Sequence, residues 1–428
     1  MLVAFSVQNY RSIRERQTMS LLASKSSEMR ENVIDVTGVA ALEGQSILRS
    51  AAVYGANASG KSNFVRALVA LTEMVSGSAK ESTQTDNLPV TPFRLDSVSS
   101  KLPTEFAVTF VISGVLYQYK LAVTQKRVEH EELIAYPKRK PQCLFVRSRD
   151  QAGQQHWRFS RTHFRRDKDI ETRTRDNSLY VSVCAQFNHK LLTEVQGFFQ
   201  NIDFRMPDTE EMEQAFTAHI CLKNDGFRRW AGKQLDEMDT GIDSLEAEKR
   251  DVRSEVPAGA KKVVPVDVSE QLQTQAIVHT VHRIPGTAKT VTWSIANESD
   301  GTKQLLTLLR SWYELMRLGR IVVVDELDAS LHPLLSRKLV ELANNRETNP
   351  KGGQLVFTTH DASLLDPCLL RRDQVFFTER EGTGASRLYS LLEYAPRKDE
   401  ALQKGYLAGR YGAVPFLGGF GFGQDTTT

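Results

Sequence analysis

One run of residues near the start of the chain has the types and spacing needed to hold phosphate. Gly55-Ala56-Asn57-Ala58-Ser59-Gly60-Lys61-Ser62 satisfies the pattern GxxxxGK[ST] at every position. Glycines in such a loop let backbone N–H groups point at phosphate oxygens, and the following helix adds its partial positive charge. We predict that Lys61 reaches the β and γ phosphates of ATP and that the Ser62 hydroxyl ligates Mg²⁺. The residues expected to bind the nucleotide here are Gly55, Asn57, Ser59, Gly60, Lys61, Ser62 and Asn63.

A second cluster supplies the carboxylates that hydrolysis needs. Ile321-Val322-Val323-Val324 predicts a fully buried parallel strand, and Asp325 and Glu326 follow it directly. Ligands of such sheets bind at the carboxyl ends of the strands. We expect Asp325 to serve Mg²⁺, mainly through water, and Glu326 to polarise the attacking water.

Two further segments belong to the same pattern. The apolar run 354–359 predicts another buried strand, and His360 at its end could hydrogen-bond a phosphate or the attacking water. Between the phosphate loop and the acidic pair, Ser299-Asp300-Gly301 opens a segment with apolar residues at helical spacing. A helix start of this kind can bind an anion, but on this segment alone an ordinary helix cap is the favoured interpretation.

The elements around these residues are those of an α/β protein. An apolar run over 47–54 predicts a strand before the phosphate loop, and Phe64, Leu68, Leu71 and Val75 predict a helix after it. The 428 residues would fill two or three compact bodies, or one large domain with an insertion.

The composition excludes several classes of protein. A net charge of +3 is too small for a nucleic-acid coat, and no apolar run approaches the length of a membrane span. We therefore expect a cytoplasmic protein with no membrane partner. The four cysteines are scattered and have no metal-ligand spacing, which is typical of reduced thiols.

The order of these motifs resembles the ABC ATPase head of the SMC and RecF-like branch. The resemblance implies an α/β fold with a mixed sheet flanked by helices and interrupted by an insertion. It also implies that Ser299 and Gly301 of one copy contact the γ phosphate held by a second copy. By the same resemblance, Asp328 lies at the seam between the copies, His360 is the switch histidine and Arg11 approaches the nucleotide. Two departures are the sequence Ser299-Asp300-Gly301-Thr302-Lys303-Gln304 in place of LSGGQ, and the coupling glutamine, for which Gln84 is the candidate.

The motifs suggest a division of the chain. We predict an ATPase lobe over 1–140, a mostly α-helical insertion over 141–264, a second ATPase lobe over 265–395 and a glycine-rich tail over 396–428. No heptad run indicates a coiled-coil arm. Residues 157–175 are rich in arginine, with Trp157, Phe159 and Phe164 interleaved, and this leaves nucleic acid open as a partner.

Within the branch, Leu331-His332-Pro333 is similar to overcoming-lysogenization-defect ATPases and to bacterial abortive-infection and phage-defence ATPases, including the PARIS ATPase subunit. That resemblance implies a homo-oligomeric scaffold of at least two copies that senses a phage-derived trigger. It controls a toxic effector acting in trans, such as a TOPRIM-type nuclease, because too little chain follows His360 for such a domain. The alternatives are a DNA-repair ATPase of the RecF type and, less favoured, a subunit of a membrane transporter.

Overall fold

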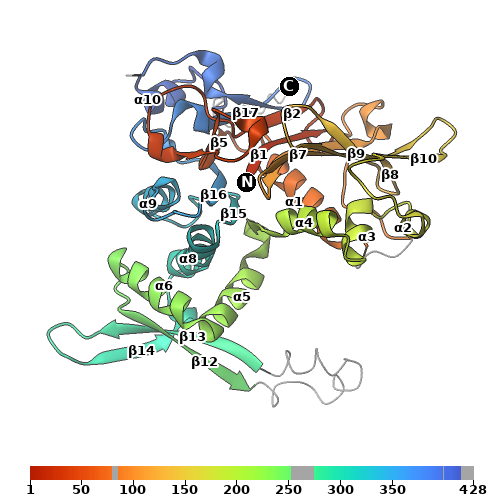
Figure 1. The fold of residues 1–428 in the computed structure, drawn as a ribbon. Helices are drawn as coiled ribbons and strands as arrows, with labels where there is room; N and C mark the ends of the chain where they lie inside the picture. The colour runs from red at the N-terminus through yellow and green to blue at the C-terminus, as the bar shows by residue number, and fades with distance from the viewer. Residues whose placement is uncertain (80–84, 252–273, 399, 416–428) are drawn as a thin grey trace, which may run out of the picture.

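The computed structural model describes residues 1–79, 85–251, 274–398 and 400–415 (Figure 1). Two large sheets lie side by side, and a smaller three-stranded sheet lies apart from them beyond three helices. The candidate Gln84 lies outside the described residues.

The six-stranded sheet carries the sequence motifs. Its spatial order is β11 (Ile202–Arg205), β15 (Ile321–Val324), β16 (Gln354–Thr359), β5 (Ser50–Gly55), β17 (Val375–Arg380) and β18 (Ser386–Ser390). All neighbours pair in parallel except β17 and β18. Every residue of β5, β15 and β16 is buried, as expected for parallel strands covered on both faces. The prediction of an α/β fold with a mixed sheet flanked by helices is confirmed.

Side chains of β5 alternate between two hydrophobic cores. Ala51 and Val53 face the core that contains α1 (Lys61–Gly77), whereas Ala52 and Tyr54 face the core that contains α8 (Asp300–Leu318) and α9 (Pro333–Asn344). Because alternate side chains of β5 are buried in these two cores, the strand lies between the two helical layers, and so does the phosphate loop at its end.

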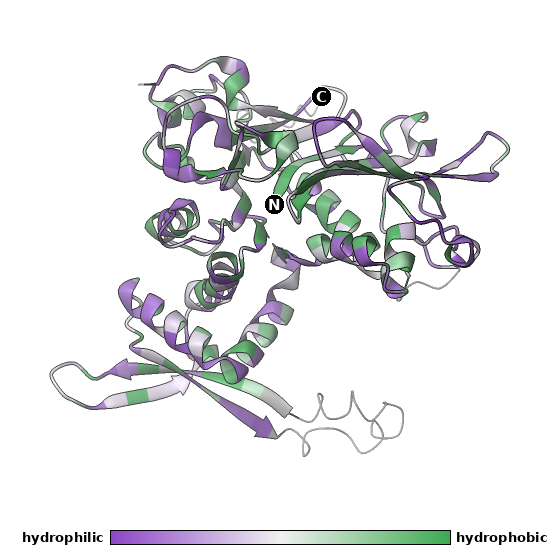
Figure 2. Cartoon of the chain, in the orientation of Figure 1, coloured by the Kyte–Doolittle hydropathy of each residue, from purple (hydrophilic) through white to green (hydrophobic). Residues whose placement is uncertain are grey.

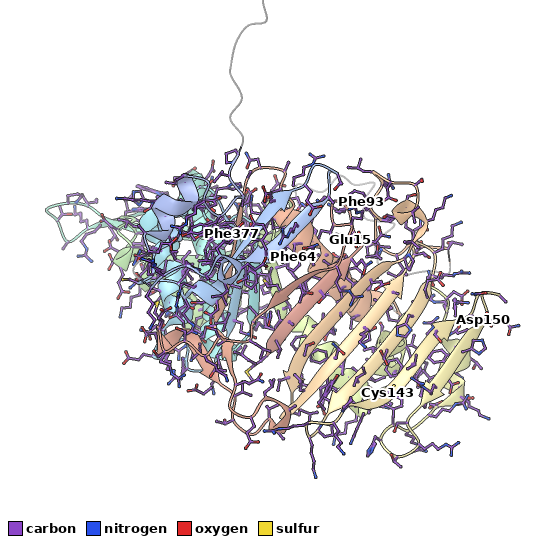
Figure 3. The ribbon with its side chains drawn as sticks, turned by 90° about the horizontal axis from the view of Figure 1, so that it is seen from above. Glu15, Phe64, Phe93, Cys143, Asp150 and Phe377 are labelled. Atoms are coloured by element: carbon purple, nitrogen blue, oxygen red, sulfur yellow. The ribbon has the colours of Figure 1, made fainter. Side chains whose placement is uncertain are left out.

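The seven-stranded sheet is antiparallel throughout. Its spatial order is β10 (Gln155–Phe159), β9 (Gln142–Arg149), β8 (Val128–Tyr136), β7 (Val115–Val123), β6 (Thr104–Ile112), β1 (Leu2–Gln8) and β2 (Gln17–Ser20). One face packs on α1, α3 (Tyr180–Gln186) and α4 (Lys190–Gln200), where the rings of Phe110 and Phe198 stack 4.3 Å apart. Figure 3 looks onto the opposite face, where the strands lie in front of the helices and Cys143 and Asp150 mark the outer strands.

The three-stranded sheet consists of β12 (Ser244–Asp251), β13 (Thr274–Arg283) and β14 (Thr290–Ser294), all antiparallel. It packs on α5 (Glu210–Lys223) and α6 (Asp225–Glu237), and these helices pack on α8. Hydrophilic residues dominate β12, in contrast to the strands of the main sheets (Figure 2). The remaining elements are the pair β3 (Val33–Asp35) and β4 (Ser46–Leu48), and the short helices α2 (Lys168–Arg173) and α10 (Leu402–Leu407).

The predicted insertion, residues 141–264, contains helices α2 to α6 and also strands. Strands β9 and β10 belong to the seven-stranded sheet, and β11 pairs with β15. The division of the chain at 140, 264 and 395 stays a prediction.

The segment 402–413 packs within its own chain. Tyr406 and Tyr411 are buried, and their rings lie 5.5 Å and 5.8 Å from that of Phe377 in β17. Residues 416–428 of the predicted tail lie outside the described residues.

Candidate nucleotide-binding site

The phosphate loop joins β5 to α1 and leaves no space for side chains at two of its glycines. A Cβ at Gly55 would lie 2.4 Å from the Thr378 hydroxyl, and one at Gly60 would lie 2.2 Å from the Ser386 hydroxyl. Gly60 also has a φ of 113°, in the left-handed region where glycine is favoured. Strands β17 and β18 therefore hold the loop against its own sheet.

Lys61 places its charge inside the loop. Its Nζ donates to the carbonyls of Gly55 and Ala56, at 2.7 Å and 3.1 Å. Only 5% of the residue is exposed, and this burial lowers the pKa of Lys61 to about 8, against the opposing attraction of nearby carboxylates such as Asp325.

The acidic pair occupies the end of β15. The Thr358 hydroxyl donates to Oδ1 of Asp325 at 2.7 Å and accepts the backbone N–H of Glu326 at 2.8 Å. Glu326 has a φ of 60°, which a non-glycine residue rarely adopts and which this hydrogen bond helps to maintain. The side chains of the two adjacent acids consequently have different surroundings: Asp325 is buried below the loop, and Glu326 faces the cavity.

His360 follows the neighbouring strand β16. Both carboxylate oxygens of Asp328 accept its backbone N–H, each at 3.2 Å. Burial, and then the nearby Lys61 cation, lower the pKa of the His360 imidazole. The imidazole is therefore neutral at pH 7.

A cavity of about 540 Å³ brings most of the predicted residues together. Its lining includes Arg11, Asn57, Ser59, Gly60, Lys61, Ser62, Asn63, Glu326 and His360. Gly55 and Asp325 lie beneath it and contact its walls through the hydrogen bonds of Lys61 and Thr358.

The cavity wall also contains residues that sequence reasoning missed. These are Ser12, residues 91–95, Arg380 and Gly384. The backbone N–H of Arg11 donates to the Thr91 carbonyl at 2.7 Å, which ties the segment 91–95 to the first turn. No local motif marks these residues, since the wall forms only where the β17–β18 hairpin meets the start of the chain.

Ser299 and Gly301 do not line this cavity. Ser299 is the N-cap of α8, and its hydroxyl accepts the backbone N–H of Thr302 at 3.2 Å. A Cβ at Gly301 would lie 2.6 Å from the Ser330 carbonyl oxygen, so this glycine packs closely against the loop after Asp328. The structure therefore separates the Ser299 turn from the phosphate loop of the same chain.

The residues present suit Mg²⁺ as part of a nucleotide complex. The Ser62 hydroxyl and the Asp325 carboxylate are oxygen donors, which Mg²⁺ prefers. The described part of the chain contains no group of three or more His, Cys, Asp or Glu residues that could hold a metal. Such a site fits an ion that takes only one or two protein ligands and completes its shell with phosphate and water.

The arginine-rich stretch is only partly a free basic surface. Trp157, Phe159 and Phe164 pack around Tyr180, with ring centroids 4.9 Å to 6.4 Å from it. Arg166 pairs with Glu171 at 2.6 Å. The exposed cations of the stretch are Arg158, Arg161, Arg165, Arg166, Lys168 and Arg173. The aromatic residues therefore pack on a hydrophobic cluster, in which Phe164 is buried and Trp157 and Phe159 are half-buried.

No helix within the described ranges is both long enough and apolar enough to cross a membrane.

Comparison with solved structures gives distant similarities. "SMC head domain from Thermotoga maritima" is 14% identical, with a TM-score of 0.41, and the match covers 91% of this chain and 98% of that chain. The SmcHead bound to the C-winged helix domain of ScpA is 12% identical, with a TM-score of 0.45 and coverage of 92% and 98%. An Smc head domain with an extended coiled coil, bound to the C-terminal domain of ScpA derived from Pyrococcus furiosus, is 12% identical with a TM-score of 0.39 and coverage of 92% and 97%.

Comparison with curated proteins gives no match. A family model described as "AAA domain, putative AbiEii toxin, Type IV TA system" matches residues 50–366. This range is well over half of the chain and contains the phosphate loop, the acidic pair and His360. The chain therefore belongs to this AAA-domain family and is an ATPase of the phosphate-loop class.

Proposed function

We propose that the protein is an ATP-hydrolysing switch whose site is completed by a second copy, and that it serves as the sensor and scaffold of an anti-phage defence system. The observation that carries the hydrolysis is the convergence of Lys61, Glu326 and His360 on one cavity of about 540 Å³. A cavity of this size accommodates a nucleotide.

Each residue has a role that its surroundings favour. Ser62 and Asp325 would hold Mg²⁺, which neutralises charge that develops on the phosphates during transfer. Glu326 faces the cavity and would accept a hydrogen bond from the attacking water, and this hydrogen bond would polarise the water. The neutral His360 is placed to hydrogen-bond a phosphate oxygen or that water. Arg11 adds an exposed cation at the rim.

The position of the Ser299 turn supports association of two copies. Ser299 and Asp300 are exposed, and the amino end of the 19-residue helix α8 offers partial positive charge and backbone N–H groups to an anion. Because this turn does not line its own chain's cavity, the anion it serves is the nucleotide held by another copy. Asp328 lies beside His360 and marks the seam.

The defence role rests on the family. Its description names a toxin of a type IV toxin–antitoxin system, which agrees with the resemblance of Leu331-His332-Pro333 to abortive-infection ATPases. We infer that the ATP-bound oligomer holds or releases a toxic effector in trans, of the TOPRIM nuclease class, when a phage component is sensed.

The test is the native mass of the Glu326→Gln variant, purified with ATP from cells that express its natural gene neighbourhood. An assembly of two or more copies that carries a second polypeptide is the expected result. The matched control combines Glu326→Gln with Lys61→Ala and should yield single copies. A homo-oligomer that carries only nucleic acid would replace the defence proposal with the DNA-repair alternative, and a monomer with bound ATP would contradict the shared site.

A further inference from the structure

A single carboxylate joins the three-stranded sheet to the Ser299 turn. Oε1 of Glu298 accepts hydrogen bonds from the Thr280 hydroxyl at 2.6 Å, from Nε2 of His282 at 2.8 Å and from Nε1 of Trp293 at 2.6 Å. The rings of His282 and Trp293 also stack, with centroids 4.2 Å apart. Two strands, β13 and β14, therefore meet on one oxygen of the residue that immediately precedes Ser299.

These donors hold the carboxylate in its charged form. Burial acts to raise the pKa of Glu298, but the hydrogen bonds from Thr280, Trp293 and His282 outweigh it, so the pKa lies below its usual value. The side chain of Glu298 is only 12% exposed and that of His282 only 14% exposed. Hydrogen bonds to a charged and largely buried acceptor are stronger than bonds between neutral groups.

Gly301 packs the Ser299 turn against the Ser330 carbonyl, but the segment that leads into the turn is loosely packed. The short 3₁₀ turn Ile295–Asn297, which leads into it, contains no buried residue. Ile295 and Ala296 face a cavity of about 190 Å³, whose other walls come from α5, β13 and α8. Thr217 in that wall is 1% exposed, and its hydroxyl has no hydrogen-bond partner in the structure. Atoms that border a cavity lack packing partners on that side, and the hydrogen bonds of Glu298 tie this loosely packed segment to the three-stranded sheet.

The middle of α8, by contrast, is fixed. Arg310 pairs with Asp203 at 3.1 Å and with Glu213 at 3.3 Å, and the Ser311 hydroxyl accepts a hydrogen bond from Arg205 at 2.5 Å. A change in the contacts of Glu298 would therefore act on the amino end of α8, next to Glu298, while the middle of the helix stays held by these ion pairs.

We propose that Glu298 is a positioning residue that sets the Ser299-Asp300-Gly301 turn for its contact with the nucleotide of a second copy, and that the three-stranded sheet is thereby a regulatory input to ATP-driven association. This inference rests on the proposed function. It assigns to β13 and β14 a role that no sequence motif in them indicates.

The experiment compares Glu298→Leu, which keeps volume but removes the acceptor, with Glu298→Gln, which keeps a carbonyl acceptor for Thr280 and Trp293. Two quantities are measured: the affinity for a fluorescent ATP analogue at protein concentrations below association, and the protein concentration that gives half-maximal ATP turnover. For Glu298→Leu we expect the half-maximal concentration to rise about ten-fold or more, with nucleotide affinity within about two-fold of the wild-type value. Glu298→Gln should shift it by less than about three-fold, since most of the acceptor is retained.

Glu248→Leu is the matched control. Glu248 also contacts a histidine of β13, His279 at 3.0 Å, but its side chain is exposed, and its strand β12 pairs with β13 and not with β14. It should leave both quantities unchanged. Thermal unfolding of every variant checks the fold, and Trp293→Phe, which removes one donor while keeping an aromatic ring, replaces Glu298→Leu if that variant does not fold. A smaller rise of the half-maximal concentration is then expected.

The outcomes separate the two claims. If wild-type turnover per protomer does not depend on protein concentration, the shared site is wrong and the inference falls with it. If wild-type turnover does depend on concentration while Glu298→Leu, or Trp293→Phe in its place, matches the wild type, only the role of Glu298 is wrong. A loss of nucleotide affinity equal to the loss of association would also overturn it, because the carboxylate would then act on the fold of the whole site.

Discussion

The phosphate loop and the Ser299 turn, the two halves of the proposed shared site, are held in place differently. The phosphate loop follows β5, a strand in which every residue is buried, and its Ser59 hydroxyl hydrogen-bonds that of Thr378 at 2.6 Å. Ser299 and Asp300 are exposed, the segment that leads into them borders a cavity, and Glu298 ties that segment to β13 and β14. The loop is thus enclosed by its own sheet, whereas the turn lies at the surface. Under the proposed function the loop holds the nucleotide of its own chain and the turn contacts that of a second copy, so substitutions in the two should have different effects.

The largest effect on ATP turnover should come from a substitution in the cavity that holds the nucleotide within one chain. Glu326→Gln should lower ATP turnover about 10³-fold, because an amide cannot polarise water as a carboxylate does. ATP affinity should stay close to that of the wild type, since Lys61 and the loop are untouched. Phosphate release and equilibrium binding measure the two quantities. Turnover at the wild-type rate would show that another group activates the water.

Asp203→Ala tests the buried ionic network that joins β11 to the middle of α8. Asp203 accepts from Arg205 at 2.9 Å and from Arg310 at 3.1 Å, and both arginines are buried. Removing one member of a buried ionic network leaves charge uncompensated, and we expect a loss of about 3 kcal/mol of stability. The melting temperature, followed by circular dichroism, should fall by several degrees, and by less for Asp203→Asn, which keeps an acceptor oxygen. Equal melting temperatures for Asp203→Ala and the wild type would show that the network is not a structural joint.

Lys61→Ala should weaken ATP binding about 100-fold at any protein concentration, because the cation acts within one chain. Fluorescent-nucleotide titration measures this affinity. Lys126→Ala, at an exposed lysine of the β7–β8 turn, is the control and should bind normally. If the ATP affinity of Lys61→Ala recovered as the protein concentration rose, Lys61 would not act within one chain, and the distinction between the phosphate loop and the Ser299 turn would fail.

Ser299→Asp should have a smaller effect and only on association. Aspartate caps a helix as well as serine does, so stability is kept, but its charge repels the phosphate of the other copy. We expect ATP-driven dimerisation in the Glu326→Gln background to weaken about ten-fold, as measured by sedimentation velocity. Ser299→Asn, an equally good but neutral cap, should weaken it less. If the two variants associate equally, the Ser299 turn does not face an anion.

The sequence predicts the phosphate-binding half well, because its signals are local. A buried strand, a glycine loop and a helix adjoin in the chain, and the run Ile321-Val322-Val323-Val324 ends directly at Asp325. The helix predicted from Phe64, Leu68, Leu71 and Val75 likewise agrees with α1, where all four side chains are buried. Each of these elements is specified by its own residues.

The remaining features depend on pairing between distant segments. Strand β12 reads Ser-Leu-Glu-Ala-Glu-Lys-Arg-Asp, a composition that favours helix, and it becomes a strand through its pairing with β13. Arg94 reaches the nucleotide cavity because its segment is tied to the first turn of the chain, and Arg380 because β17 and β18 fold back onto that turn. The role of Glu298 is hidden in the same way, since its three donors lie 5 to 18 residues away from it.

Gly301 has a consequence for how sequences of this family are compared. Its close approach to the Ser330 carbonyl oxygen requires glycine for the fold of a single chain, whether or not a second copy ever binds there. A descendant that had lost hydrolysis would therefore be under the same selection to keep this glycine. Retention of Gly301 in a homologue would thus record folding, and the loss of enzymatic activity would be visible instead at Glu326 and Ser299.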